Sequence, residues 1–323
     1  MNPRDIQEHR RVELLRPPTG RVEMVLDTDA FNEIDDQFAI AYALLSKENM
    51  DVRAVYAAPF HNGNSDGPED GMVKSYDEIM KVLDLVGRPS DGVAFRGSRS
   101  WMAGAESPVE SDAAHDLIRR AKQERDGPLY VVAIGAITNV ASALLLAPEI
   151  TDRIVLVWLG GQPFHWQHAS DFNLKQDLHA ARVVLDCGVP LVLVPCMTVM
   201  THLTTTLAEV EANVKGRGRI GDYLYGIYEG CYEDHFARTR VIWDVAGIAY
   251  LVDNGWVPTR LVPSPILTER VTWSQDGGRH LIRMAYHTHR DPIFRDLFTK
   301  LARHSDQGVH TDEREQEVQC VSD

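Results

Sequence analysis

Short apolar runs alternate with amphipathic segments along most of this chain. Each run is rich in Val, Ile and Leu and is bounded by polar or glycine-rich residues, a pattern that predicts buried strands. The segments between the runs repeat apolar side chains at helical spacing, as Phe38, Tyr42 and Leu45 do. Strands that alternate with helices through short connections form mostly parallel sheets covered on both faces. The pattern therefore predicts an α/β fold with an open, mostly parallel, doubly wound (Rossmann-like) sheet.

The predicted elements form one domain, because no internal repeat or flexible linker interrupts the alternation. We expect this domain to span residues 21–303, after a polar N-terminal arm at 1–20 and before a polar, disordered tail at 304–323. The expected strands are 22–26, 51–58, 92–97, 129–134, 153–159 and 190–194, with more between 261 and 282. The expected helices are 35–46, 73–86, 113–125, 139–146, 178–185, 220–235, 246–252 and 292–302.

Composition and charge narrow the class of protein. The 323 residues are 44% hydrophobic and 25% charged, which is ordinary for a globular chain. A net charge of −14 argues against binding to a nucleic-acid backbone or an anionic membrane. Residues 1–20 lack the apolar core of a signal peptide, and no apolar run reaches the ~20 residues of a membrane span. The four cysteines are scattered, as expected of reduced thiols. We expect a cytoplasmic protein with neither nucleic-acid nor membrane partners.

Four aspartates gather around the first predicted strand and helix. Asp27 and Asp29 end the strand, and Asp35 and Asp36 begin the helix. In open α/β sheets, ligands bind in the crevice at this position. Carboxylates so close together repel one another and raise each other's pKa unless a cation lies among them. Oxygen ligands suit Ca²⁺ or Mg²⁺, so we expect a metal site here. The alternative is that one or two of the aspartates only cap the helix.

Polar residues also follow the later predicted strands. Asn64 lies in the loop after the second strand, and Thr138 and Asn139 form a strand-to-helix turn. A chemically dense segment at 162–173 follows a Gly-Gly pair, and Asp244 precedes an apolar helix. The carboxyl ends of parallel strands meet at one edge of the sheet, so these groups can serve the same crevice. Turn formation and helix capping remain the alternatives for each of them.

Taken in order, these pieces resemble the nucleoside hydrolase family, the inosine-uridine preferring, calcium-dependent N-ribohydrolases. The amino-terminal signature of that family is close to DTDPGIDDA, and here it is DTDAFNEIDDQ, two residues longer and without the Pro-Gly pair. The other motifs keep the chain order over about residues 22 to 303, although none is specific alone. They are Gly63-Asn64, the turn 135–141, Gly160-Gly161, the DFN segment 171–173 with Asp177, and Trp243-Asp244-Val245.

The resemblance implies an enzyme of nucleoside metabolism that hydrolyses the N-glycosidic bond of a ribonucleoside. In such an enzyme Asp29 is the general base for a calcium-bound water, and the sugar passes through an oxocarbenium-like transition state. The resemblance also implies a homodimer or homotetramer that binds a small nucleoside-like substrate. Carried over to this chain, the Ca²⁺ ligands are Asp29, Asp36, Asp244 and the carbonyl of Thr138, with support from Asp27. The residues for the sugar hydroxyls are Asp35, Asn64, Asp171 and Asn173.

The departures from the family pattern concern the side of the leaving group. Trp243 replaces a histidine that, in one branch of the family, is thought to protonate the departing base. His165 replaces an asparagine that contacts the sugar, and Asp171 is a shortened glutamate. Residues 31–33 enlarge the first loop, which would border the sugar site. His165, His168 or His235 could supply the missing acid, and Trp243 could stack on an aromatic base. The sequence leaves the base and the exact substrate open.

Two other functions compete with this interpretation. A phosphohydrolase of the haloacid dehalogenase type also begins with an apolar strand and DxD, but it expects Thr or Val where Phe31 stands. It also predicts neither the Thr-Asn turn nor the DFN segment. A sugar-binding relative that has lost turnover would keep the same metal-binding aspartates, so only activity separates it from an enzyme.

Overall fold

A sheet of eight strands forms the centre of the computed structural model, which describes residues 6–320 and their side chains through residue 306. The strand order is β3-β2-β1-β4-β5-β6-β12-β9, and every neighbouring pair is parallel except β12 with β9. This confirms the predicted mostly parallel, doubly wound α/β sheet. The strands are β1 (Val22–Thr28), β2 (Met50–Ala57), β3 (Ala94–Arg96), β4 (Leu129–Ala133), β5 (Ile154–Leu159), β6 (Leu191–Val194), β9 (Thr259–Pro263) and β12 (Leu281–Ala285).

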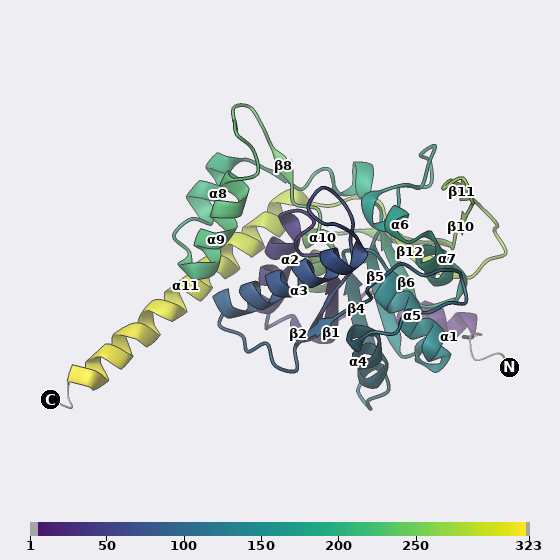
Figure 1. Cartoon of the computed structure of the whole chain (residues 1–323), viewed down its shortest axis with the longest axis horizontal. Helices are drawn as coiled ribbons and strands as arrows, with labels where there is room; N and C mark the ends of the chain where they lie inside the picture. The colour runs from purple at the N-terminus through teal and green to yellow at the C-terminus, as the bar shows by residue number, and fades with distance from the viewer. Residues whose placement is uncertain (1–5, 321–323) are drawn as a thin grey trace.

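Helices cover both faces of this sheet (Figure 1). They are α1 (Glu8–Leu14), α2 (Asp35–Leu45), α3 (Pro68–Leu85), α4 (Asp112–Ala121), α5 (Thr138–Leu146), α6 (Phe172–Gln176), α7 (Leu178–Asp186), α8 (Leu207–Asn213), α9 (Gly218–Glu229), α10 (Val245–Val252) and α11 (Arg290–Cys320). The minor elements are the 3₁₀ turn η1 (Pro148–Ile150), the π-helical turn η2 (Cys196–Met200), and the short strands β7 (Thr204–Thr205), β8 (Arg240–Val241), β10 (Ile266–Leu267) and β11 (Trp273–Ser274).

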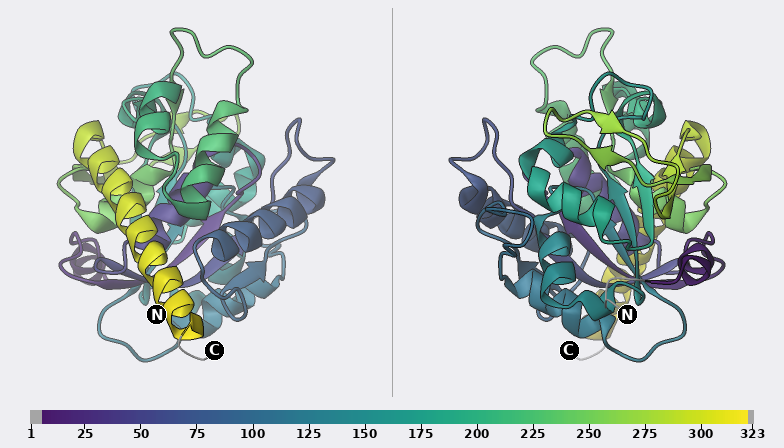
Figure 2. Two further views of the ribbon diagram at one scale, coloured as in Figure 1. Left: turned by 90° about the vertical axis from the view of Figure 1, so that its left-hand side faces the viewer. Right: turned by 90° about the vertical axis from the view of Figure 1, so that its right-hand side faces the viewer.

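Alternation along the buried strands divides the core into two layers. In β4, Leu129 and Val131 pack in the layer with α4, α5 and α7, whereas Tyr130 and Val132 pack in the layer with α2, α3, α9, α10 and α11. Successive side chains of a strand point to opposite faces, so each apolar strand supplies both layers. The two opposite views in Figure 2 show α11, in yellow, crossing one face and the helices of the middle of the chain covering the other.

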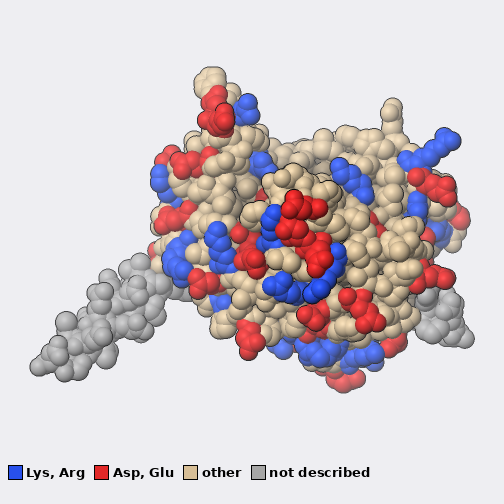
Figure 3. Space-filling view, in the orientation of Figure 1, with Lys and Arg blue, Asp and Glu red and all other residues tan. Residues whose placement is uncertain are grey.

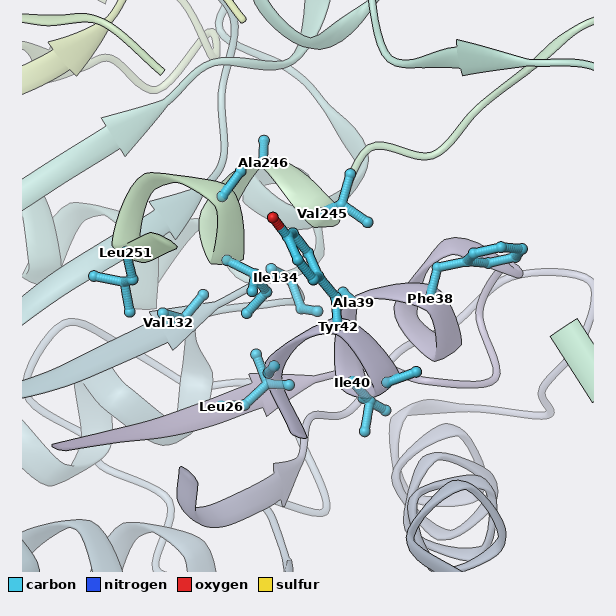
Figure 4. Close-up of a cluster of buried hydrophobic side chains, with 14 of the residues drawn as sticks. Leu26, Phe38, Ala39, Ile40, Tyr42, Val132, Ile134, Val245, Ala246 and Leu251 are labelled. Atoms are coloured by element: carbon cyan, nitrogen blue, oxygen red, sulfur yellow. The ribbon is translucent and has the colours of Figure 1, made fainter. Parts of the chain in front are cut away.

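One cluster of the core holds α2 and α10 side by side. Figure 4 shows the ring of Tyr42, from α2, pointing toward Val245 and Ala246 of α10. The hydroxyl of Tyr42 donates a hydrogen bond of 2.7 Å to Asp296 of α11, which satisfies the polar end of this buried ring. Because both helices begin at the carboxyl edge of the sheet, this packing brings the residues at their amino ends together.

The two ends of the chain differ in detail from the predictions. Within the predicted N-terminal arm, α1 packs on the domain through buried Leu14 and Leu15 and through the Arg11 guanidinium, which donates to the carbonyl of Gly188. The last helix, expected to end at residue 302, continues as α11 to Cys320, where a tail without structure was predicted. Sequence periodicity missed this extension because residues 304–320 are mostly polar and repeat no apolar stripe at helical spacing.

The surface carries charges of both signs. Acidic and basic side chains are interspersed on the face shown in Figure 3. None of the helices in residues 6–320 is both long enough and apolar enough to cross a lipid bilayer.

Candidate functional site

A cavity of about 210 Å³ opens at the carboxyl edge of the sheet, where the predicted motifs converge. The strands β1, β4, β5 and β6 end there, and α2, α6 and α10 begin there. This is the position at which doubly wound sheets bind ligands. The cavity is lined by Asp29, Asn32, Glu33, Asp35, Ile134, Leu159, Asp171, Phe172, Asn173, Cys196, Trp243 and Asp244.

Three carboxylates form a compact group, and two of them, Asp35 and Asp244, line the cavity. Each of Asp35, Asp36 and Asp244 offers an oxygen atom, and these atoms lie within 4.8 Å of one another. Asp35 and Asp36 begin α2, and Asp244 is the N-cap of α10, so the positive ends of two helix dipoles face the group. We refer to these three residues and Asp29 as the acidic floor. All four are buried.

The grouping differs in one member from the metal set that the resemblance implied. That set contained Asp29, Asp36 and Asp244, whereas in the described residues the group within mutual reach contains Asp35 in place of Asp29. Asp29 is nonetheless close enough to repel its neighbours, because Asp36 and Asp35 both raise its pKa. The predicted roles of Asp29 as a ligand and Asp35 as a sugar contact therefore remain predictions.

Burial and mutual repulsion disfavour the charged forms of the acidic floor. Loss of water is the main cause of the raised pKa of Asp29, Asp36 and Asp244, and neighbouring carboxylates add to it. Burial, followed by the charge of Glu33, raises the pKa of Asp35 to about 7. A divalent cation would remove this conflict between burial and charge.

Asp27 and Asp29 each keep one oxygen without a hydrogen-bond partner among the described residues. The other oxygen of Asp27 accepts a bond of 2.7 Å from the Asn139 amide, whose carbonyl oxygen is held by Ser98. Gly135 leaves room for Asp29, because a Cβ at Gly135 would lie 3.1 Å from the Asp29 carboxyl carbon. Buried polar atoms without partners are rare in folded proteins, so these two oxygens are available to a ligand.

The donor chemistry of the site fits a hard cation. The carboxylates offer oxygen atoms only, and oxygen is the ligand that Ca²⁺ and Mg²⁺ take. The residues present therefore fit the metal that the resemblance implied. Thr138, whose carbonyl was the remaining predicted ligand, is buried at the start of α5. Its hydroxyl donates to Asp177 at 2.8 Å, which fixes this turn to the start of α7.

Asp171 and Asn173 line the cavity as the resemblance led us to expect. Asp171 caps α6, and its Oδ1 accepts bonds from the backbone N–H groups of Gly161 and Leu174. Burial raises the pKa of Asp171 to about 6 although these N–H groups oppose the shift. The Asn173 amide donates to the carbonyls of Ile134 and Leu159, at the ends of β4 and β5. These two bonds fix the orientation of the Asn173 side chain.

The remaining side of the cavity is apolar and aromatic. Trp243 lies next to the acidic floor, and its backbone N–H donates to Asp35 at 3.2 Å. Burial, with the charges of Asp171 and Asp35, raises the pKa of the Cys196 thiol to about 12, so this thiol keeps its proton. We refer to this side as the apolar wall. Its residues are Ile134, Leu159, Phe172, Cys196 and Trp243.

Two residues expected to contact the sugar lie outside the cavity. Asn64 is exposed, and its amide donates to the carbonyl of Asn32 at 3.0 Å, so Asn32 rather than Asn64 reaches the cavity. His165 is exposed and borders a separate cavity. The buried side chain of Gln162 bonds to Ser170 and to the backbone of Met197, and this anchor turns the following residues outward. Neither position matches the predicted sugar contact.

The other candidate acids also lie elsewhere. The ring of His168 packs against Trp166, and the ring of His235 lies 2.8 Å from the carbonyl oxygen of Glu229. In the part of the chain that the structure describes, no histidine, lysine or arginine lines the cavity. Arg240 is a nearby cation, and it forms an ion pair of 2.8 Å with Glu33.

Sequence reasoning missed most of the apolar wall. Cys196 follows β6, and the backbone of η2 departs from helical geometry there, with Thr198 at φ 64°. A cysteine after an apolar run carries no functional signal in a single sequence. Phe172 stands inside the DFN motif, where only its polar neighbours were assigned. Asn32 and Glu33 belong to the enlarged loop, which was expected to border the site and does so.

Comparisons with known proteins identify what this chain is similar to. The family model for inosine-uridine preferring nucleoside hydrolase matches residues 24–290, which include every predicted site residue. A probable uridine nucleosidase 2 from Arabidopsis thaliana is 27% identical over 281 residues, covering 80% of this chain and 83% of the relative. Pyrimidine-specific ribonucleoside hydrolase RihA from Klebsiella pneumoniae is 31% identical over 193 residues, covering 53% and 58%. The solved structure of a purine-preferring ribonucleoside hydrolase from Gardnerella vaginalis superimposes with a TM-score of 0.70 at 20% identity, covering 88% and 99%.

Proposed function

Because the chain belongs to the inosine-uridine preferring nucleoside hydrolase family and is thereby a hydrolase of N-glycosyl bonds, we propose that it cleaves ribose from an aromatic base. The substrate is a ribonucleoside or a related riboside. The observation that carries this proposal is the convergence of the acidic floor with Asp171 and Asn173 in one cavity of about 210 Å³. That volume is below the ~300 Å³ at which sites for drug-sized ligands begin, and it suits a sugar with its base toward the mouth.

Asp29 is the proposed general base. Its Oδ2 is buried without a partner in the described structure, and its raised pKa makes its carboxylate a stronger base than an exposed aspartate. A water molecule that attacks the anomeric carbon transfers its proton to this oxygen. Asp27, on β1, lies two residues before Asp29, and a hydrogen bond from the Asn139 amide holds its carboxylate in place.

The sugar is bound by the polar residues of the cavity. Asp35, Asp171 and the carbonyl oxygen of Asn173 accept hydrogen bonds from ribose hydroxyls. As the base departs, positive charge develops on the sugar ring, and the surrounding carboxylates stabilise it without having to move. Holding the sugar in a fixed orientation against the water also lowers the entropic barrier.

A calcium ion is the proposed cofactor. Asp36, Asp244 and Asp35 or Asp29 would hold it, together with the carbonyl of Thr138. When bound, a divalent cation supplies Lewis acidity that makes a coordinated water easier to deprotonate and orders the ribose hydroxyls. Calcium accepts the larger number of oxygen ligands, which favours it over magnesium in a site with this many carboxylates.

The base lies against the apolar wall. Trp243 and Phe172 both line the cavity, and their aromatic rings are the proposed contacts of an aromatic leaving group. The relatives do not decide which base this is, since their names include uridine, pyrimidine and purine specificities.

The test is release of reducing sugar by the purified protein from uridine, inosine and 4-nitrophenyl riboside, with calcium and with a chelator. The proposal expects calcium-dependent release from at least one of them. If calcium binds tightly and no riboside is cleaved, the proposed cleavage of ribosides is wrong. Release that is unaffected by removal of all divalent cations would refute the metal site.

A further inference from the structure

The cavity combines strong negative charge with an aromatic surface, and among the described residues its lining contains no histidine, lysine or arginine. Five of its lining residues carry carboxylates. A divalent cation in the floor and the ion pair of Arg240 with Glu33 would leave a formal negative charge on the lining. This negative charge does not attract an uncharged base, and it repels a base that departs as an anion.

The neutral bases of ordinary nucleosides leave as anions unless an acid protonates them. Such an acid has to lie within hydrogen-bond reach of the base. The cavity of the described chain offers no imidazole, ammonium or guanidinium group, and its one thiol, Cys196, is a very weak acid. The position beside the metal-binding aspartate is occupied by Trp243, whose indole nitrogen is not a useful acid at neutral pH.

Resting on the proposed hydrolysis of ribosides, we propose that the preferred substrates are cationic ribosides, in which the base is a positively charged aromatic ring such as a pyridinium. A cation over the face of an indole is attracted by the ring quadrupole, and tryptophan gives the strongest such interaction. We assign that role to Trp243 because it lines the cavity, and the carboxylates of the cavity supply the long-range attraction. Trp243 and the carboxylates of the cavity thus both favour a positively charged ligand.

The reaction then needs no acid. The bond between C1′ and the ring nitrogen breaks, and its electron pair returns to the nitrogen and cancels the positive charge of the ring. The oxygen of water forms the new bond to C1′, and the proton of that water goes to Asp29. The products are ribose and a neutral base, which no longer has the charge that held it against Trp243 and leaves the cavity easily.

The experiment compares two ligands that differ in charge but hardly in shape. Nicotinamide riboside is the cationic probe, and its reduced 1,4-dihydro form is the neutral one. Each is used as a competitor of 4-nitrophenyl riboside, a substrate whose leaving group needs no protonation, in the calcium-loaded enzyme. The proposal expects the inhibition constant of the cationic form to be about tenfold lower or better.

Variants assign the preference to the indole. In Trp243→Leu the ratio of the two inhibition constants should fall by about fivefold or more, whereas Trp243→Phe should keep part of it because an aromatic face remains. Trp256→Phe is the matched control, since Trp256 follows the far end of α10 and does not line the cavity. Equal constants for the two forms in the wild type would overturn the inference.

The same assay separates this inference from the proposed function. If 4-nitrophenyl riboside is cleaved and the two competitors bind equally, the chain is a ribohydrolase without a preference for cations. If neither 4-nitrophenyl riboside nor nicotinamide riboside is cleaved, the proposed function itself fails, and the inference fails with it. Uridine or inosine cleaved with kcat/KM equal to that of nicotinamide riboside would also contradict the preference.

Discussion

The acidic floor and the apolar wall of the cavity differ in chemistry and in origin. The residues of the floor lie at the end of β1 and at the starts of α2 and α10. The core cluster around Tyr42 holds the two helices side by side. The wall comes from five positions spread over the ends of β4, β5 and β6, the start of α6 and the residue before Asp244. The residues proposed for the proton and metal chemistry thus lie at one strand end and two helix starts, whereas the surface proposed to contact the leaving group is assembled from five separate positions.

The largest expected effect is the loss of turnover caused by a substitution in the acidic floor. Asp29→Asn removes the proposed base while keeping the size of the side chain, so kcat should fall by about 10³-fold with the fold intact. Steady-state sugar release measures the loss, and Asp152→Asn, an exposed aspartate, serves as the matched control. Turnover within a factor of two of wild type would remove Asp29 from the mechanism.

The free energy of unfolding should depend on the hydrogen bonds that join the Thr138 turn to the start of α7. Asp177 is buried and accepts bonds from the N–H groups of Met102 and Ala180 and from the hydroxyl of Thr138. Asp177→Ala leaves these donors without partners, and we expect a loss of about 2–3 kcal/mol in the free energy of unfolding. Urea denaturation measures it.

The control for that substitution is Ser111→Ala, which removes the partly exposed N-cap of α4 and should cost about 1 kcal/mol. An equal cost for the two substitutions would show that Asp177 is an ordinary helix cap rather than a link between the Thr138 turn and α7.

A substitution in the wall should change selectivity rather than the basic reaction. Trp243→His introduces an imidazole beside Asp244, so neutral bases can be protonated as they leave. We expect kcat/KM for uridine to rise about tenfold or more relative to that for nicotinamide riboside. Trp243→Phe introduces no acid and should not raise the relative rate for uridine. An unchanged profile across the leaving groups in Trp243→His would place Trp243 away from the base.

The acidic floor should also set the pH dependence of stability. Burial raises the pKa of Asp27 and Asp35 to about 7 and that of Asp171 to about 6. The cation-free folded chain therefore binds more protons than the unfolded chain between about pH 4 and 7. Its free energy of unfolding should fall as pH rises through this window, with a slope of roughly 1 kcal/mol per pH unit for each additional proton that the folded chain holds.

Calcium should reverse that loss, because it takes the place of the protons. Thermal unfolding with chelator and with calcium, at pH 5.5 and pH 8, measures the effect. We expect the calcium-induced rise in Tm to be larger at pH 8, where protons no longer compete for the carboxylates. A rise that is equal or larger at pH 5.5 would contradict the role of these buried carboxylates.

The sequence was sufficient for the fold and for most of the floor because both depend on local patterns. Apolar runs followed by aspartates predict strand ends, and the order of strands and helices predicts a parallel sheet with its crevice at those ends. The family resemblance rested on these same positions. The residue pattern placed Asp27, Asp29 and Asp36 near one another, and the family resemblance added Asp244.

The wall could not be predicted because it depends on contacts between distant segments. The outward turn at His165 follows from the anchoring of Gln162 by Ser170 and Met197, and the replacement of Asn64 by Asn32 follows from a bond between two loops. Phe172 and Cys196 have no spacing that marks them. Such side chains are placed by the packing of loops on a finished sheet, which single-sequence patterns do not encode.

A calcium titration followed in two ways on the same protein tests whether the acidic floor is a metal centre that turnover requires. Calorimetry gives the affinity and stoichiometry of binding, and sugar release from 4-nitrophenyl riboside gives the calcium dependence of turnover. We expect one strong site per chain, lost in Asp244→Ala, and half-maximal activity at the calcium concentration that half fills this site. Full turnover while the site is empty would contradict the claim that the acidic floor is the metal centre of the reaction.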